Sequence, residues 1–290
     1  MTTLKHTARL LSAVLLMAGL TGCISIEQST PLQWGQGHSV TPVRGLPEQL
    51  PSGIVRLKET QYVYVHADHG AELLVSMVVP IPFVTDMAIG SYKDAVDNSH
   101  KNQYAKIDPY VITVQQMRGH PAFRASGGNY TLYPVVVLSE TSDERYLLSL
   151  VYQIEAGDWM SRYFYHLPMS IAAADIQEIP EPQLAQLAEQ LETGAKILID
   201  TIDKRVRGDI PEHGPGVTLG SLYFLSGNIG GLVGPETFKV KDSELLLEES
   251  DYIIARVPGD PDTDAAGGGL AYGVHYLYKD QLHLFERQAQ

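Results

Sequence analysis

Residues 182–207 carry the strongest periodic pattern in the chain. Apolar side chains recur there at every third or fourth position, which is typical of a helix that buries one face. These side chains are Leu184, Leu187, Ala188, Leu191, Ala195, Leu198, Ile202 and Val206. Pro182 suits a first helical turn, and Gly208 suits the left-handed residue that ends a helix. The pattern therefore predicts a long amphipathic helix.

Residues 55–66 alternate between apolar and polar side chains, as a half-buried strand does. Val63 and Val65 fall on the apolar face. Tyr62 and Tyr64 fall on the other face, which meets either solvent or a second layer of the fold. The alternation predicts one strand, and the apolar run at residues 72–79 can pair with it as a hairpin.

The remaining periodic segments favour an α+β fold. Helical spacing recurs over residues 84–104, and strand-like runs follow at 110–117, 130–138, 145–154 and 159–167. Further strand candidates lie at 217–225, 245–257, 270–278 and 282–285, the last two as a hairpin. Short turns separate many of these runs, and short turns join antiparallel neighbours. We therefore expect a largely antiparallel sheet with two helices plus a C-terminal β-rich segment.

The change from helix to strands places a boundary near residues 208–216. Residues 54–208 are then an α+β domain. Residues 216–290 are a β-rich segment or a small β domain, or else they add strands to the first sheet.

Composition excludes several classes of protein. With 290 residues, 44% of them hydrophobic, the chain is long enough for a substantial core. Its single cysteine excludes a disulfide scaffold and any zinc site built from two or more thiolates. A net charge of −13 without a basic block argues against a nucleic-acid partner.

The first 23 residues have the layout of a secretory signal. Lys5 and Arg9 precede or border an apolar run at residues 10–20, which is shorter than the roughly 20 residues of a membrane-spanning helix. The sequence Leu20-Thr21-Gly22-Cys23 follows. It resembles the lipobox of bacterial lipoproteins, in which a Leu, a small or polar residue and Gly or Ala precede the lipidated Cys. The resemblance implies that residues 1–22 are a cleaved signal peptide and that Cys23 carries acyl chains such as palmitate.

The residues after Cys23 extend this expectation to a location. In lipoproteins of Gram-negative bacteria an Asp after the lipidated Cys favours retention in the inner membrane, so Ile24 implies the inner leaflet of the outer membrane, facing the periplasm. Residues 23–53 are rich in Pro and Gly and predict a flexible tether. Removal of residues 1–22 leaves 19 basic and 34 acidic residues, a net charge of −15 that anionic headgroups repel. Membrane attachment is therefore expected from the lipid.

Two clusters have residue types that bind metals. His66 and His69 flank a turn, but a strand points them to opposite faces and a third ligand must come from elsewhere. Asp260, Asp262 and Asp264 have the spacing of a calcium loop without its Gly and its bidentate Glu. Both clusters favour polar surface turns, with a weak metal site as the alternative, and we expect no cofactor.

Tyrosine is over-represented, with 16 Tyr against 2 Trp and 6 Phe. A tyrosine combines a large apolar area with a polar tip, which suits a binding surface. The alternation of the strands gives two candidate sets: Tyr62 with Tyr64, and Trp159 with Tyr163 and Tyr165. Sheets also favour tyrosine for packing alone, and that alternative stays open.

Two functions follow from these patterns. The first is a non-catalytic, lipid-anchored periplasmic protein that binds an envelope protein or a cell-wall glycan, or takes part in envelope assembly. The alternative is an envelope hydrolase or a metal-dependent enzyme that uses His66 and His69. The sequence has no GxSxG elbow, SxxK pair or phosphate-binding loop that would favour catalysis.

Overall fold

The computed structural model describes residues 37–47, 55–56, 60–65, 106–141, 143–157, 159–176, 178–224, 239–257 and 272–288. The strands are β1 (Val40–Pro42), β2 (Val55–Arg56), β3 (Tyr62–Val65), β4 (Tyr130–Glu140), β5 (Arg145–Ala156), β6 (Trp159–Ala172), β7 (Gly216–Gly220), β8 (Val240–Glu248), β9 (Tyr252–Val257), β10 (Gly273–Tyr278) and β11 (Leu284–Arg287). The helices are α4 (Pro109–Met117) and α5 (Glu181–Arg207), with short 3-10 turns η1 (Ala173–Asp175), η2 (Leu222–Phe224) and η5 (Lys279–Gln281).

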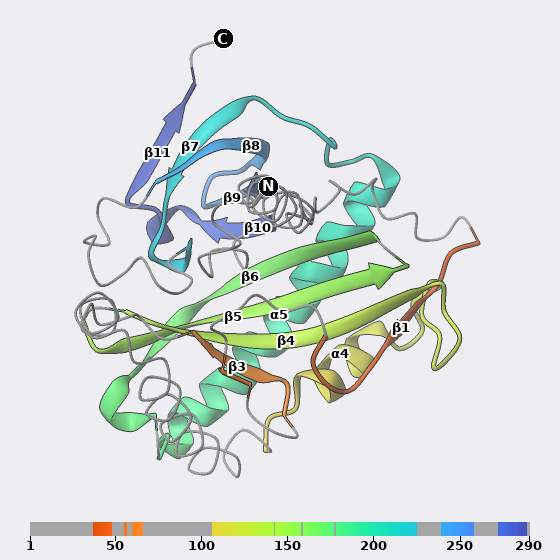
Figure 1. Ribbon diagram of the computed structural model, residues 1–290, viewed down its shortest axis with the longest axis horizontal. Coiled ribbons are helices and arrows are strands. Elements are labelled where there is room, and N and C mark those ends of the chain that lie inside the picture. The colour runs from red at the N-terminus through yellow and green to blue at the C-terminus, as the bar shows by residue number, and fades with distance from the viewer. Residues whose placement is uncertain are drawn as a thin grey trace, which may run out of the picture.

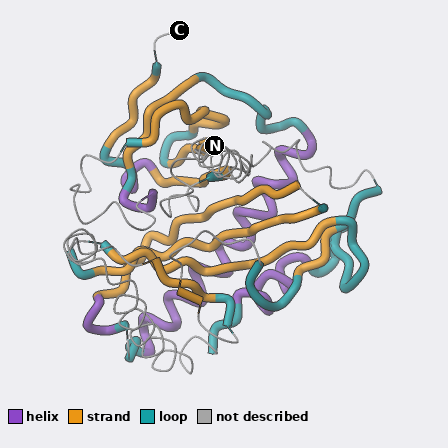
Figure 2. Tube along the Cα trace, in the orientation of Figure 1, coloured by secondary structure: helices purple, strands orange, loops and turns teal. Residues whose placement is uncertain are grey.

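The strands form one sheet in the order β11-β7-β8-β9-β10-β6-β5-β4-β3-β2, and β1 pairs with β4 (Figures 1 and 2). Most neighbours are antiparallel; β1 with β4, β3 with β4 and β10 with β6 are parallel. The largely antiparallel α+β fold predicted from the sequence is confirmed. The C-terminal strands extend the same sheet through the pairing of β10 with β6.

Helix α5 covers one face of the strands β5 and β6, and α4 packs beside it (Figure 1). The apolar stripe predicted from the sequence is the buried face of α5, where Leu187, Leu191 and Ile202 are fully buried. Gly208 ends the helix at φ 80°, and its N–H bonds to the carbonyl oxygens of Arg205 and Lys204. Charged residues line the outer face of α5, so it is a surface helix. No helix in the described part of the chain has the length and apolar content to cross a membrane.

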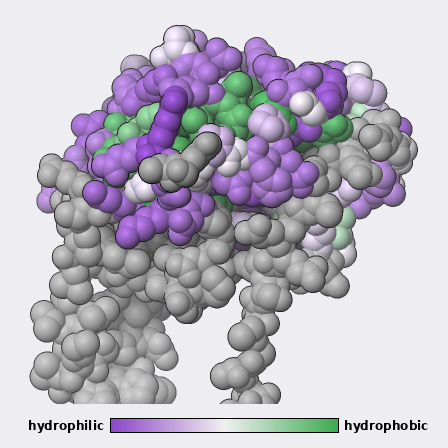
Figure 3. All heavy atoms as spheres, turned by 90° about the horizontal axis from the view of Figure 1, so that it is seen from above, coloured by the Kyte–Doolittle hydropathy of each residue, from purple (hydrophilic) through white to green (hydrophobic). Residues whose placement is uncertain are grey.

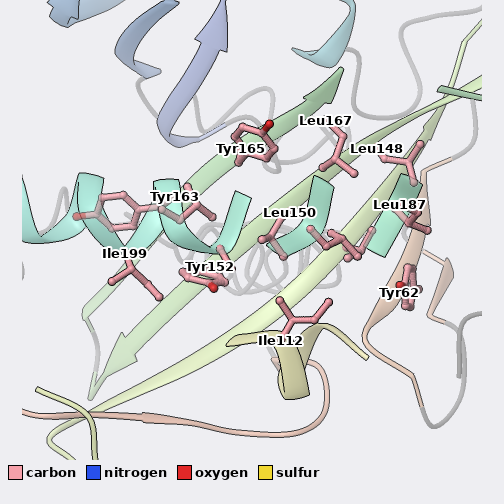
Figure 4. Packing of buried hydrophobic residues seen from close by; sticks show 14 of the residues in the cluster. Tyr62, Ile112, Leu148, Leu150, Tyr152, Tyr163, Tyr165, Leu167, Leu187 and Ile199 are labelled. Atoms are coloured by element: carbon pink, nitrogen blue, oxygen red, sulfur yellow. The ribbon is translucent and has the colours of Figure 1, made fainter. Parts of the chain in front are cut away.

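The main core lies between this face of the sheet and the two helices. Figure 4 shows Tyr62, Leu150 and Tyr152 from the sheet gathered with Leu187 and Ile199 from α5 and Ile112 from α4. The fit is closest at Gly194 of α5, where an added Cβ would lie 2.4 Å from Cδ1 of Tyr165. Glycine therefore lets the helix backbone approach the β6 tyrosine ring.

The opposite face of the sheet carries two further hydrophobic clusters. One joins Val63, Val65 and Phe164 with neighbours on β4 and β5. The other joins Val217, Phe224 and Leu277 in the C-terminal strands. Val63 and Val65 are buried, as the alternation predicted.

Residues 110–117 form most of helix α4, so the strand predicted there is wrong. Asp108 caps the helix, because its side chain accepts hydrogen bonds from the backbone N–H groups of Tyr110 (2.9 Å) and Val111 (3.3 Å). Pro109 occupies the first helical position, where the missing N–H is harmless. The capping signal outweighs the strand preference of the β-branched residues that follow.

Two predicted pairings also differ from the structure. Residues 55–56 and 62–65 are separate antiparallel strands, with Val55 opposite Tyr64, so the single strand predicted there is wrong. Strand β11 pairs with β7 and not with β10, because β9 and β6 already occupy the two edges of β10. The flexible tether predicted over residues 23–53 is wrong for residues 40–42, which form β1 beside β4 and bury Val40 in the main core. The expected segments at 72–79 and 84–104 lie outside the described residues.

Candidate functional site

The aromatic residues predicted to form an exposed face lie mostly in the core. Tyr62 and Tyr64 are fully buried, and the Tyr62 hydroxyl donates to the carbonyl of Ile107 at 3.0 Å. Tyr163 and Tyr165 are 3% and 1% exposed, whereas Trp159 is half-buried. Of the two alternatives left open by the sequence, an exposed binding face and packing under a second layer, these four tyrosines take the second, because a layer of helices covers that side of the sheet.

The other predicted site residues lie outside the described part of the chain. These are Cys23, His66, His69, Asp260, Asp262 and Asp264. Within the described residues, no group of three or more His, Cys, Asp or Glu side chains is placed to hold a metal ion.

A set of tyrosines that shares only Tyr165 with the predicted residues gathers where β9 and β10 pass the C-terminal end of α5. We call Tyr165, Tyr252, Tyr276 and Tyr278 the tyrosine cluster. The rings of Tyr252 and Tyr276 stack with their centroids 4.4 Å apart and their planes at 18°. The ring of Tyr278 meets that of Tyr276 edge-on at 5.5 Å, and its hydroxyl lies 3.4 Å from the hydroxyl of Tyr165. Tyr165 is the buried base of the cluster, and the other three are half-buried.

The strand register explains this gathering. Tyr276 pairs with Tyr165 across the parallel β10–β6 junction, and Tyr278 pairs with Tyr252 across the antiparallel β10–β9 junction. Because side chains alternate along a strand, Tyr276 and Tyr278 share the helix-side face, while His275 and Leu277 point to the other face. The three neighbouring strands β6, β10 and β9 therefore place four tyrosine side chains next to one another on the same face of the sheet.

The electrostatic surroundings of the cluster are acidic. Burial raises the pKa of Tyr252, and the carboxylates of Glu249, Asp251 and Asp200 raise it further, against the opposing effect of Lys204. Glu249, Asp251 and Asp200 are exposed. Lys204 is engaged by Asp200, with 2.7 Å between Nζ and Oδ2. The half-buried rings thus lie beside three carboxylates and one ammonium group. We call Glu249, Asp251 and Asp200 the acidic rim of the tyrosine cluster.

Of these four tyrosines only Tyr165 was among the predicted binding residues, although the sequence holds a signal for two of the others. Tyr276 and Tyr278 have the two-residue spacing that puts side chains on one face of a strand, within a segment predicted as a strand. The pairing of β10 with β6 is not encoded in any local pattern, so the meeting with Tyr165 could not be read from the spacing.

The other face of the same junction holds a buried polar chain. Oγ of Ser149 lies 2.7 Å from Nδ1 of His166, and Nε2 of His166 lies 2.9 Å from Nδ1 of His275. All three residues are buried, and the rings of Phe164 and His275 stack at 4.2 Å. Burial and the nearby His275 hold the pKa of His166 well below its usual 6.5. His166 is therefore neutral at pH 7, and each hydrogen bond in the chain needs one donor and one acceptor.

A pocket of about 330 Å³ lies beside the hydrogen-bonded residues Ser149, His166 and His275. Its lining is Leu147, Pro168, Leu222, Tyr223, Asp280, Gln281, Leu282 and His283. Tyr223 donates to the carbonyl of Leu167 (2.5 Å), and Gln281 donates to the carbonyl of His166 (3.0 Å), so both side chains bind the β6 backbone. Ser149 and His166 do not line the pocket. The buried hydroxyl and imidazoles therefore link β5, β6 and β10 and do not present a nucleophile to the pocket.

Comparisons with known proteins give no relative that identifies the chain. No family model matches the sequence, and no curated protein matches it. One solved structure, described as the crystal structure of an uncharacterized protein, is similar over 58% of this chain and 88% of its own, with 12% identity and a TM-score of 0.20. A similarity at that level assigns neither a family nor an activity.

Proposed function

We propose that this protein is a lipid-anchored periplasmic lipoprotein that acts as a non-catalytic binding or envelope-assembly protein. The half-buried tyrosine cluster with its acidic rim carries the binding part of the proposal. It offers stacked aromatic area at the surface of a well-packed body, and aromatic side chains contribute strongly to interface energy.

The sequence around Cys23 supports the anchoring part. The single cysteine of the chain occupies the position that the lipobox requires. Two or three acyl chains hold a protein firmly on a bilayer where one chain binds marginally. Ile24 favours the outer membrane. Residues 24–36 precede the first described residues and are the part of the expected tether that we propose as a spacer between the lipid and the folded body.

Site-specific photocrosslinking in the intact envelope tests the binding proposal. A benzophenone amino acid replaces Tyr276 in one strain and Gln115, an exposed residue of α4, in a matched control strain. We expect a partner adduct, identified by mass spectrometry, at position 276 and not at position 115. Equal adducts at the two positions, or none at 276, contradict a binding role for the tyrosine cluster.

A further inference from the structure

We infer that the tyrosine cluster and its rim bind a basic segment of a partner protein, through the guanidinium or ammonium groups of that segment. The inference deepens the proposed binding function and rests on it. It narrows the partner to one chemical class.

The aromatic part of the surface favours a cation. Arginine and lysine side chains bind over the faces of tyrosine rings because the ring quadrupole attracts positive charge. Tyr252 and Tyr276 stack on each other and are half-buried, so their orientations are fixed by the fold. The ring of Tyr278 packs nearly perpendicular to that of Tyr276, with an angle of 83° between the planes. A platform fixed in this way loses little side-chain entropy when a partner binds.

The charges around the platform have the complementary sign. Glu249 and Asp251 lie in the turn between β8 and β9 and are exposed. Asp251 directly precedes Tyr252, and the N–H of Glu249 bonds to the carbonyl oxygen of Tyr252 at 3.0 Å. The nearby positive groups are engaged elsewhere: Lys204 pairs with Asp200, and Lys279 pairs with Glu248 at 3.1 Å. Glu249 and Asp251 thus supply the negative field that a cationic side chain above the rings would experience.

The charge of the whole chain points the same way. The sequence has 34 acidic and 21 basic residues, so its long-range field attracts cationic partners and repels anionic headgroups. A neutral glycan would gain stacking on the rings and could donate hydroxyl hydrogen bonds to the carboxylates, but it would gain no attraction between opposite charges. The aromatic and acidic groups together favour a basic protein segment over a lipid or a glycan.

Binding of a fluorescently labelled hexa-arginine peptide, followed by anisotropy, tests the inference. The variant Tyr252→Leu/Tyr276→Leu removes the ring faces and keeps apolar volume. Tyr130→Leu is the control, because Tyr130 is a half-buried tyrosine that packs on Trp159. We expect the double variant to weaken binding about fivefold or more, the range that cation–π contacts allow, and the control to leave it unchanged. Thermal melts show whether each variant is folded.

A second pair of variants separates local from overall charge. Glu249→Gln/Asp251→Asn removes two charges beside the rings, and Glu178→Gln/Glu189→Gln removes two exposed charges near the other end of α5. We expect weaker binding in the first and unchanged binding in the second. Equal losses in both, or unchanged binding in the double leucine variant, mean that the peptide follows net charge alone and overturn the inference.

A chitin tetrasaccharide serves as the neutral-glycan probe in the same assay. Binding of this glycan at the tyrosine cluster, without binding of the peptide, overturns the inference in favour of a carbohydrate. The proposed function has a separate readout: a partner adduct at position 276 that contains no basic segment would leave the binding function standing and remove only the cationic class.

Discussion

His166 and His275 meet through their ring nitrogens, 2.9 Å apart and away from solvent, at the junction where β10 joins β6. Both side chains are 1% exposed. The folded state holds His166 as a neutral group, with its pKa well below the usual 6.5 because of burial and the neighbouring imidazole. In the unfolded chain the same imidazole titrates normally.

The first prediction concerns pH. Below pH 6.5 His166 binds a proton in the unfolded state but stays neutral in the folded state. The free energy of unfolding therefore falls as the pH drops through and below that value. One such group gives a slope of at most about 1.4 kcal/mol per pH unit. We expect the melting temperature of His166→Gln to depend less steeply on pH between 7 and 5 than that of the natural protein. His283→Gln, an exposed histidine variant, is the control; identical pH slopes for His166→Gln and the natural protein would contradict the prediction.

The second prediction concerns the anchor. Cys23→Ser removes the thiol that we propose to be lipidated, and we expect a folded body that no longer sediments with membranes. Fractionation in high salt measures this, with the natural protein as the control. Continued sedimentation of a Cys23→Ser protein whose signal peptide has been removed would contradict lipid attachment.

The third prediction concerns the core under α5. Leu191 is fully buried, and Leu191→Ala should lower the free energy of unfolding by about 2–5 kcal/mol. Glu189→Ala, on the exposed side of the same helix, should change it by less than about 0.5 kcal/mol. Gln190 is a poorer control, because its side-chain oxygen accepts a hydrogen bond from the N–H of Met169 at 3.2 Å. Chemical denaturation compares the variants, and equal midpoints would refute the packing.

The fourth prediction concerns the close approach at Gly194. Alanine favours helices over glycine by about 1 kcal/mol, but here its Cβ would lie 2.4 Å from the Tyr165 ring. We expect Gly194→Ala to destabilise the fold by about 1–3 kcal/mol, as overpacking does. The measurement is the melting temperature. Thr193→Ala, at the exposed neighbouring position, should be harmless, and a more stable Gly194→Ala protein would show that the ring moves freely.

The fifth prediction concerns the helix cap. Asp108→Ala removes the acceptor for the N–H groups of Tyr110 and Val111, and should cost about 0.5–2 kcal/mol of stability. Asp108→Asn keeps a capping oxygen and should recover most of the loss. Chemical denaturation measures the stability of the two variants. Equal losses of stability would mean that Asp108 acts through its ion pair with Arg44 and not through the cap, because Asn keeps the capping oxygen and removes the charge.

Local patterns predicted the elements better than their pairing. The stripe on α5 arises from burial of one face of the helix, and the apolar runs of β4, β5 and β6 arise from burial of both faces of the sheet, so both patterns are visible in the sequence. Helix α4 was missed because Asp108 and Pro109 act through backbone capping, which hydrophobic periodicity does not register. The tyrosines show the same limit. Alternation separates the two faces of β3, but it does not predict that Tyr62 and Val63 are both buried, each in a different hydrophobic cluster. Their burial depends on residues that are distant in the sequence and cover the two faces.

The parallel pairing of β10 with β6 also sets the order in which the fold can be completed. His166 and His275 are 109 positions apart, so the β6 edge meets its partner only after nearly the whole chain has been synthesised. Until then the backbone groups of that edge and the side chains of Phe164 and His166 have no β10 beside them. Such long-range pairing is slow, and an unpaired edge invites association with other chains. In a chain that stops short of residue 273, the edge of β6 that β10 covers would stay unpaired. Aggregation through this edge is the expected consequence.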